Sequence, residues 1–259
     1  MGRSHLINWK FQRLHHLLSD HEKVVFGFLT MLPNLIDLRE QYPLPIESGV
    51  CVRANPLISG QPCMGTVEIA EELRLRHPVV RKDGIKEQWV MSTDYLIDLQ
   101  APGDLIDFLA ISVKFEDELT DPRKLELLRI EREYWRRQGI VWLLLTPQLY
   151  DRSIVAGILA GMSWATDNAS VNPSMIEQCA LLQHHLTGMT LSQIESVLIA
   201  HLRVDQGEAK RIFWQAIWSG RVHINLARCM RPNAMLEFLS EDAFWRQNPI
   251  ASRRTAWKM

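Results

Sequence analysis

Asp94, Ser112 and Lys114 have the types and spacing that metal-dependent cleavage of a phosphodiester requires. Asp94 lies in one apolar segment, and Ser112 and Lys114 lie in the next. A turn centred on Gly103 would place Asp94 opposite Ser112, and alternation of side chains would put Lys114 on the same face. The Asp94 carboxylate and the Val113 carbonyl would supply oxygen ligands to a hard cation, which stabilises phosphate charge and lowers the pKa of bound water. Lys114 could then orient the water or neutralise the developing charge.

An aspartate and a lysine on adjacent strands are common, so this pattern alone is a weak signal. Glu22 is a further candidate, since a helix that precedes the sheet can contribute an acid to such a site. Locally, Ser19 to Glu22 forms a capping box, which favours a structural role for Glu22. Glu131, on the helix after Lys114, could support the site, but its arginine-rich surroundings favour an exposed charge.

Hydrophobic periodicity predicts the elements that must position these side chains. Pro102-Gly103 marks a turn, and Asp121-Pro122 begins a long helix. The expected helices are 19–30, 67–75 and 121–138, and the expected extended segments are 35–44, 88–99, 105–115 and 140–145, the last buried on both faces. No clear strand is expected over 46–83. The layout predicts an α/β domain with a mixed sheet over residues 1–165.

A polar linker at 166–170 separates this domain from a mainly helical one over residues 166–259. Helices are expected at 173–186, 190–202 and 205–219, followed by a short strand at 221–226. Three helices and a strand resemble a winged helix, and a small helical protein-docking domain is the alternative. Lys210 and Arg211, early in the third helix, are candidates for phosphate contacts. Arg253, Arg254 and Lys258 would form a basic tail or a solvated end.

Composition and residue spacing argue against secreted, membrane and zinc-finger proteins. The chain has 259 residues, 29 Lys and Arg against 30 Asp and Glu, and 47% hydrophobic residues, which suits folded domains with real cores. Its longest apolar run, 140–145, is far shorter than the roughly 20 residues of a membrane span, and the N-terminus lacks a signal peptide. The four cysteines have no metal-binding spacing and indicate reduced thiols of a cytoplasmic protein.

Several stretches, taken together, resemble the TnsA family, the endonuclease subunits of heteromeric bacterial cut-and-paste transposases. They cover most of the first 145 residues in order: Gly2–His5, His15–Asp20 with Glu22, Arg39–Leu44, His77–Val80, Val90–Asp98 and Glu131–Trp135. Downstream of them, the resemblance is one of layout only. The resemblance implies a restriction-endonuclease-like fold for the first domain. Nucleases of this fold carry a carboxylate on one strand, and a polar residue, a spacer and a lysine on the adjacent strand.

The resemblance also implies an activity and a site. Glu22, Asp94 and Lys114 would be catalytic in a Mg²⁺-dependent endodeoxyribonuclease, and two Mg²⁺ ions, replaceable by Mn²⁺, would be held by Glu22, Asp94, Ser112 and Val113. The enzyme would cut the non-transferred strand, at the 5′ ends of the transposon. Its partners would be transposon-end DNA, an integrase-like (TnsB-like) transposase subunit and an ATP-dependent (TnsC-like) regulator, with no membrane.

Two departures from the family pattern stand out. Ser112 occupies a position where the family has glutamine, so a shorter side chain would leave more of the cation's shell to the Val113 carbonyl and water. The chain also begins at the Gly2–His5 motif, where the family carries a further N-terminal segment. His15 and His16 could contact DNA, although exposed strand histidines are an equally good interpretation.

Two other functions use the same residues. A free-standing restriction- or repair-type nuclease would cut DNA with Mg²⁺ and no partner, whereas a transposase subunit would need its partner and transposon ends. A non-catalytic DNA-binding adaptor with a decayed nuclease fold is favoured only by Ser112. The joint presence of Glu22, Asp94 and Lys114 argues against such decay.

Overall fold

The computed structural model describes residues 3–9, 13–50, 60, 62–167, 171–228 and 233–258. The chain forms two compact units, one made of Met1–Pro33 and Pro147–Arg254 and the other of Asn34–Thr146 and Thr255–Met259. This division differs from the expected boundary at 165/166, because the N-terminal segment packs with the C-terminal helices.

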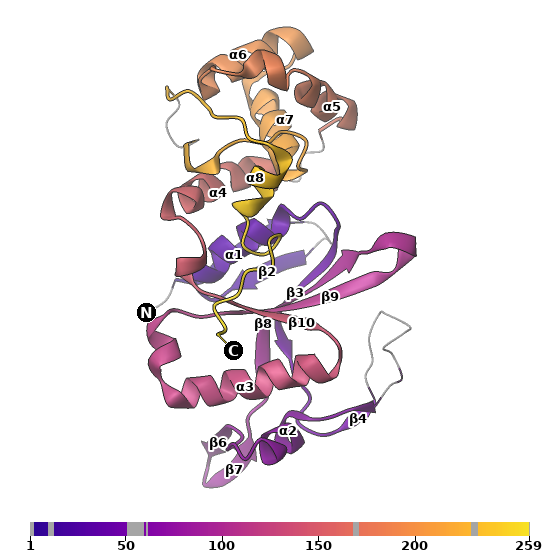
Figure 1. Ribbon diagram of the computed structural model, residues 1–259, viewed down its shortest axis with the longest axis vertical. Helices are drawn as coiled ribbons and strands as arrows, with labels where there is room; N and C mark the ends of the chain where they lie inside the picture. Colours follow the sequence, from indigo (N-terminus) through magenta and orange to yellow (C-terminus); the bar gives the residue numbers. More distant parts are fainter. Residues whose placement is uncertain are drawn as a thin grey trace. The chain divides into compact units, whose positions relative to one another are not determined.

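The Asn34–Thr146 unit is built on a four-stranded mixed sheet in the order β10-β9-β8-β3 (Figure 1). The strands are β3 (Leu35–Pro43), β8 (Ser92–Gln100), β9 (Ile106–Val113) and β10 (Val141–Leu145). β8 pairs antiparallel with β3 and β9, while β10 is parallel to β9. Helix α3 (Pro122–Arg137) makes the crossover between β9 and β10, with Asp121 as its N-cap. These elements confirm the expected mixed α/β layout and fit a restriction-endonuclease-like fold.

The β8–β9 hairpin has the expected register. Gly103 adopts a φ of 74° in the connecting turn, which a residue without Cβ allows, and Tyr95 pairs with Ile111. Leu96 and Ala110, one pair further along, are fully buried with Trp135 of α3 and Leu144 of β10 in one core cluster. The apolar face of the sheet therefore packs against α3.

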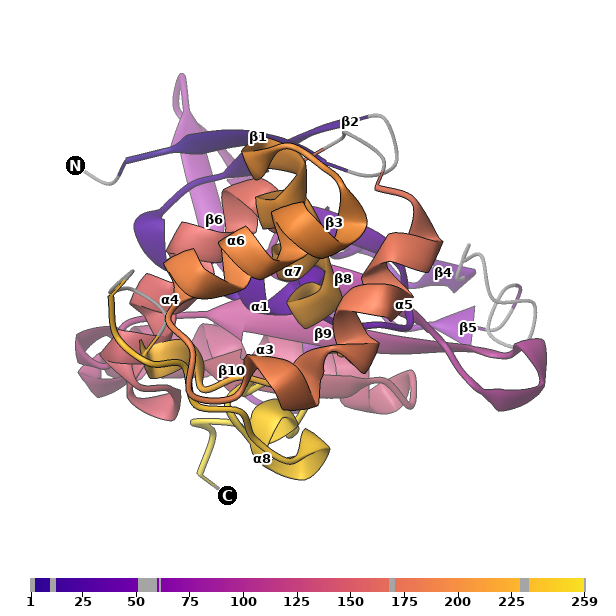
Figure 2. The same ribbon diagram turned by 90° about the horizontal axis from the view of Figure 1, so that it is seen from above.

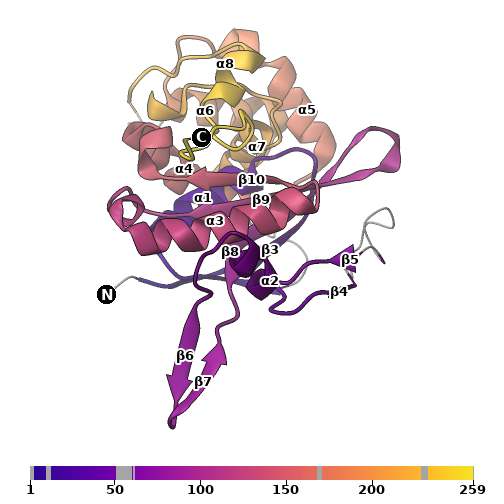
Figure 3. The same ribbon diagram turned by 60° about the horizontal axis from the view of Figure 1, so that its bottom comes forward.

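Two short hairpins and one helix complete this unit: α2 (Thr66–Glu72), β4 (Gly49–Val50) with β5 (Pro62–Cys63), and β6 (Val79–Lys82) with β7 (Ile85–Gln88). The β6–β7 hairpin projects from the rest of the unit (Figure 3). The expected strand 88–99 begins later than expected, at Ser92, and the expected lack of strands over 46–83 is wrong. Asp83 and Gly84 have φ of 50° and 79°, the signature of a tight hairpin turn.

The other unit contains an N-terminal hairpin and a group of helices (Figure 2). Its elements are β1 (His5–Trp9), β2 (Arg13–Leu17), α1 (Asp20–Thr30), α4 (Arg152–Ala165), α5 (Pro173–Leu181), α6 (Leu191–Leu202), α7 (Gln206–Trp218) and α8 (Glu241–Arg246). Trp218 Nε1 donates a hydrogen bond to Thr30 Oγ1 at 3.0 Å, and Asn248 Nδ2 donates to the Phe28 carbonyl at 2.8 Å. These buried bonds join α1 to the C-terminal helices.

The expected winged-helix features are only partly present. Helices α5, α6 and α7 correspond to the three expected helices, but the expected strand 221–226 is reduced to an isolated bridge between Ile224 and Phe238 in the part of the chain that the structure describes. Residues 168–170 of the expected linker lie outside the described residues.

The C-terminal tail is not the free basic end considered above. The Thr255 hydroxyl accepts a hydrogen bond from the Leu144 amide at 3.0 Å, and the Ala256 amide donates to the Leu144 carbonyl at 2.8 Å. Trp257 packs edge-on against Trp142, so the tail covers the outer edge of β10. Val141 is nonetheless 54% exposed, so β10 is not buried along its whole length.

Two further expectations concern membranes and thiols. Within the described ranges, no helix has the length and apolar character that crossing a membrane requires. Cys63 and Cys179 are buried free thiols, while Cys51 and Cys229 lie outside the described residues.

Replacing Gly161 by alanine is expected to destabilise the protein by about 1–2 kcal/mol, because a Cβ there would lie 2.3 Å from the rigid Trp214 ring. In an unobstructed helix the same change would stabilise by roughly 1 kcal/mol. Urea unfolding of the two proteins measures the difference. Gly49→Ala is the matched control, because nothing lies within 4 Å of its added Cβ. A Gly161→Ala protein as stable as the parent would contradict this packing.

Candidate active site

Asp94 and Lys114 meet where the β8–β9 ladder ends. The last ladder pair is Tyr95–Ile111, and beyond it the amide of Val113 donates to Asp94 Oδ2 at 2.6 Å. Lys114 Nζ lies 2.8 Å from the same carboxylate oxygen and 3.0 Å from the Val113 carbonyl oxygen. The Asp94 carboxylate thus accepts the backbone hydrogen bond at the end of the ladder, and it also binds the Lys114 ammonium group.

The two oxygens that contact the Lys114 ammonium group are also of the kind that binds a divalent metal ion. Asp94 Oδ2 and the Val113 carbonyl are hard ligands, and Mg²⁺ is commonly bound by one or two carboxylates with water and substrate phosphates completing its shell. No group of three or more His, Cys, Asp or Glu side chains that could hold a metal is found among the described residues. Two oxygens leave most of a Mg²⁺ coordination shell to other ligands, so a bound ion would also need water or substrate oxygens.

Lys114 is a persistent cation. Burial by itself would lower its pKa, but the charges of Asp94 and Glu131 outweigh that effect and raise the pKa above the ordinary lysine value. An ammonium group with a raised pKa is a poor base at neutral pH. Lys114 is therefore suited to donating hydrogen bonds and neutralising negative charge, not to removing a proton.

Glu131 lies in the core, and the expectation of an exposed charge is wrong. The residue is 4% exposed on α3. Its Oε1 accepts hydrogen bonds from the Ser112 hydroxyl at 2.5 Å and the Thr93 hydroxyl at 2.7 Å. Each hydroxyl in turn accepts from a tryptophan, Thr93 from Trp135 Nε1 at 2.7 Å and Ser112 from Trp142 Nε1 at 2.9 Å. No pattern in the sequence marks these two indole N–H groups as hydrogen-bond donors.

These contacts determine which groups the Ser112 hydroxyl can reach, and the buried surroundings shift the pKa of Glu131. Burial, followed by the charge of Asp94, raises the pKa of Glu131, while Lys114 and the two hydroxyls partly offset the effect. The Ser112 hydroxyl was expected beside a metal ion, but it points to Glu131 and Trp142. Of the expected ligands on β9, the Val113 carbonyl is the one that lies near the Lys114 ammonium.

Gln41 is a site residue that sequence reasoning missed. Its Nε2 lies 3.4 Å from Asp94 Oδ1, and its Oε1 accepts from Ser92 at 3.2 Å. Gln41 has a φ of 49°, an unusual conformation for a residue other than glycine inside a strand. Strained conformations of this kind are retained where the surroundings impose them. Gln41 belongs to the Arg39–Leu44 stretch, but nothing in its spacing pointed to Asp94.

Glu22 lies in the other unit, at the start of α1. Ser19 is the N-cap and its hydroxyl accepts from the Glu22 amide at 3.1 Å, as the capping box predicts. The carboxylate binds the Leu18 amide at 2.9 Å and the Ser19 hydroxyl at 3.1 Å, instead of the expected Ser19 amide. The side chain is thus held rigidly by the helix N-terminus, which suits a cap and a ligand alike.

The remaining candidates lie in the same unit as Glu22. His15 is buried against Trp9 and Phe26, whereas His16 is exposed on β2. Lys210 Nζ lies 5.2 Å from the centre of the Trp164 ring and 3.9 Å from a Glu195 oxygen. Arg211 lies 3.7 Å from Asp167. Both cations therefore already have acidic partners, and His15 is the candidate least accessible to DNA.

A mixed sheet that presents an aspartate and a lysine on adjacent strands is the arrangement of a restriction-endonuclease-like domain. Residues 63–147 match the model of the TnsA-like endonuclease N-terminal domain. Over 188 residues, 71% of the chain, the sequence is 35% identical to the transposon Tn7 transposition protein TnsA of Escherichia coli, and it spans 59% of the length of that relative. Both comparisons support a TnsA-family endonuclease.

The Glu131→Gln variant is expected to gain stability relative to the parent as pH rises from about 4 to 7. A carboxyl whose pKa is raised in the folded state stabilises below its unfolded pKa and loses that contribution as pH rises through the folded value. Urea midpoints measured across this range give the comparison.

The control on the same helix has the opposite sign. Hydrogen bonds from Arg136, then from Arg137, lower the pKa of Glu133 to about 2 against the cost of burial. Glu133 therefore stabilises above its unfolded pKa, and Glu133→Gln is expected to cost stability at pH 7 but not near pH 2. Parallel pH profiles for the two variants would contradict the buried location of Glu131.

Proposed function

We propose that this protein is the metal-dependent DNA endonuclease subunit of a cut-and-paste transposase. The observation that carries the proposal is the Lys114 ammonium held between Asp94 Oδ2 and the Val113 carbonyl. It lies within the segment that matches the TnsA-like endonuclease domain. The named relative is a transposition protein, which supports the biological setting.

Asp94 and the Val113 carbonyl would hold one divalent cation, with Mg²⁺ as the expected ion and Mn²⁺ as a substitute. Such a cation supplies charge stabilisation at the phosphate and a lowered pKa for water. Lys114 donates hydrogen bonds to the attacking water or a phosphate oxygen and offsets the charge that develops there. Glu131 accepts a hydrogen bond from Ser112 and so positions the β9 end of the site. Gln41 positions Asp94 by donating to the Oδ1 atom of Asp94.

The family resemblance supports the finer assignments. Glu22 would supply a further carboxylate and a second Mg²⁺ would be bound. The strand cut would be the non-transferred strand at transposon 5′ ends. An integrase-like TnsB-like subunit would process the other strand, and an ATP-dependent TnsC-like protein would regulate insertion. Helices α5 to α7 with the Ile224–Phe238 bridge would act as a winged-helix-like module for DNA or a partner.

Asp94→Asn is expected to reduce cleavage of the non-transferred strand at least about 100-fold, because the amide loses the charge that attracts the cation. The assay combines the protein, Mg²⁺, the transposase partner and transposon-end DNA. Asp107→Asn, on β9 at the opposite end of the hairpin, is the matched control and should cut normally. Undiminished cutting by Asp94→Asn would refute the assignment, and strong cutting without the partner would indicate a free-standing nuclease.

Paired substitutions separate the two roles of Glu22. Glu22→Gln keeps hydrogen-bonding atoms near Leu18 and Ser19 but removes the charge, so cleavage should fall strongly with little change in unfolding free energy. Ser19→Ala removes the cap and should cost roughly 1 kcal/mol of stability while cleavage persists. The same cleavage assay and urea unfolding measure both effects. Full cleavage by Glu22→Gln would leave Glu22 as a cap only.

A further inference from the structure

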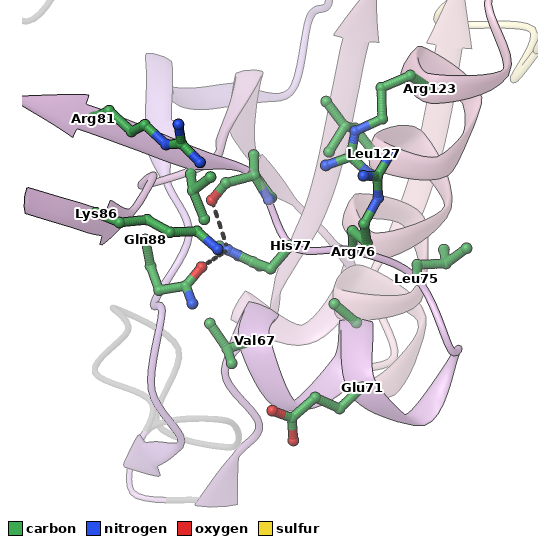
Figure 4. A pocket seen from close by; sticks show the side chains of 13 residues that line it. Val67, Glu71, Leu75, Arg76, His77, Arg81, Lys86, Gln88, Arg123 and Leu127 are labelled. Atoms are coloured by element: carbon green, nitrogen blue, oxygen red, sulfur yellow. Dashed lines mark hydrogen bonds between the residues drawn. The ribbon is translucent and has the colours of Figure 1, made fainter. Parts of the chain in front are cut away.

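A cavity of about 650 Å³ lies beside the β6–β7 hairpin, in the same unit as Asp94 and Lys114. It is bounded by α2, the segment from Leu75 to Val79, the hairpin itself and the start of α3 (Figure 4). We call it the hairpin cavity. None of its residues took part in the site described above.

The lining of the hairpin cavity is strongly cationic. Four arginine and lysine side chains face it and one carboxylate does; the cations are Arg76, Arg81, Lys86 and Arg123, and the acid is Glu71. Figure 4 shows Arg81 and Lys86 extending from the hairpin, with Arg76 and Arg123 on the opposite side and Glu71 at the far end from Arg123. Arg123 pairs with Glu126 at 2.7 Å. Arg76, Arg81 and Lys86 have no acidic partner among the described residues.

Arg81 and Lys86 form a cross-strand pair of like charge. They are directly opposite in the β6–β7 register, so both side chains project to one face. Like charges directly opposite destabilise a two-stranded ribbon. Glu87 pairs with Val80 on the other face, where its charge does not point into the cavity. An anion bound between Arg81 and Lys86 would turn their repulsion into attraction.

The hairpin is held in place from its base. His77 Nδ1 lies 2.9 Å from Gln88 Oε1 on β7, and its Nε2 lies 3.0 Å from the Thr66 hydroxyl at the start of α2. The Trp89 amide donates to the Pro78 carbonyl at 2.9 Å. The cationic face is therefore fixed against α2, although the hairpin projects beyond the sheet.

The hairpin cavity and the candidate active site are close along the chain. Gln88 lines the cavity and Asp94 follows six positions later in the sequence. An extended chain of that length spans at most about 22 Å. Phosphates of one DNA strand are spaced about 3.4 Å along the helix axis, so one short duplex could contact both places.

We propose that the hairpin cavity binds backbone phosphates of duplex DNA beside the bond that is cut. This inference rests on the proposed nuclease function and assigns it a DNA contact outside the catalytic residues. Arg81 and Lys86 would clamp one phosphate from the hairpin, and Arg76 would face it from the opposite wall. Because backbone contacts carry no sequence information, the contact would tolerate any flanking sequence.

The test compares the full chain with its Arg81→Gln/Lys86→Gln variant in binding a fluorescent 30-base-pair duplex of arbitrary sequence. Anisotropy is measured in EDTA, which prevents cutting, over a range of NaCl concentrations. The variant should bind at least about 10-fold more weakly, and its salt slope should fall by about 0.9 because one phosphate contact is lost. Arg129→Gln/Arg136→Gln, two exposed α3 positions outside the cavity, is the charge-matched control.

The outcomes separate this inference from the proposed function. Unchanged affinity or an unchanged salt slope in the hairpin variant would overturn it, as would an equal loss in the control. A urea midpoint no lower than the parent's shows that the variant is folded, and Arg76→Gln repeats the test from outside the hairpin. If Asp94→Asn fails to impair cutting while the hairpin variants lose DNA affinity, the phosphate contact stands and the assignment of Asp94 as catalytic fails.

Discussion

The end of the β8–β9 ladder is the constraint on which the candidate site depends. Backbone pairing stops at Tyr95–Ile111, and the Val113 amide then takes the Asp94 carboxylate as its acceptor. A buried amide must be paired, so this exchange fixes the carboxylate as firmly as a ladder bond would. The same oxygen fixes Lys114, and the Val113 carbonyl completes the contact. A slip of one residue in the hairpin would turn these side chains to opposite faces.

The second constraint is the balance between the charges of the candidate site and the charge of the buried Glu131 on α3. The charges of Asp94 and Glu131 raise the pKa of Lys114 against the effect of burial, while Asp94 raises and Lys114 lowers the pKa of the buried Glu131. Glu131 is tolerated in the core because two hydroxyls donate to it, and each hydroxyl is itself oriented by a tryptophan N–H. Polar chains of this kind are stable only when each member is satisfied. The packing of α3 on the sheet and the electrostatics of the site therefore depend on the same hydrogen bonds.

Several elements were predictable because their signals are local. The Ser19 cap, the Asp121-Pro122 helix start and the Pro102-Gly103 turn are each decided by neighbours within a few residues, and each lies where expected. The β8–β9 register followed from the turn. The β6–β7 hairpin was missed because its Asp83-Gly84 turn joins charged strands without an apolar face, so no periodicity marked them.

Turn chemistry and side-chain alternation act at short range, so the main strands of the sheet and the pairing that brings Asp94 to Lys114 followed from the order of residues alone, as did the resemblance to the TnsA family. Three features depended on the packing of distant elements, since each joins residues from different elements: the burial of Glu131, the partner of Ser112 and the approach of Gln41 to Asp94. The tertiary structure also joined the N-terminal helix to the C-terminal helices in one unit through Trp218 and Asn248. Burial and side-chain partners depend on which faces meet in space, and a linear pattern of residue types does not specify that.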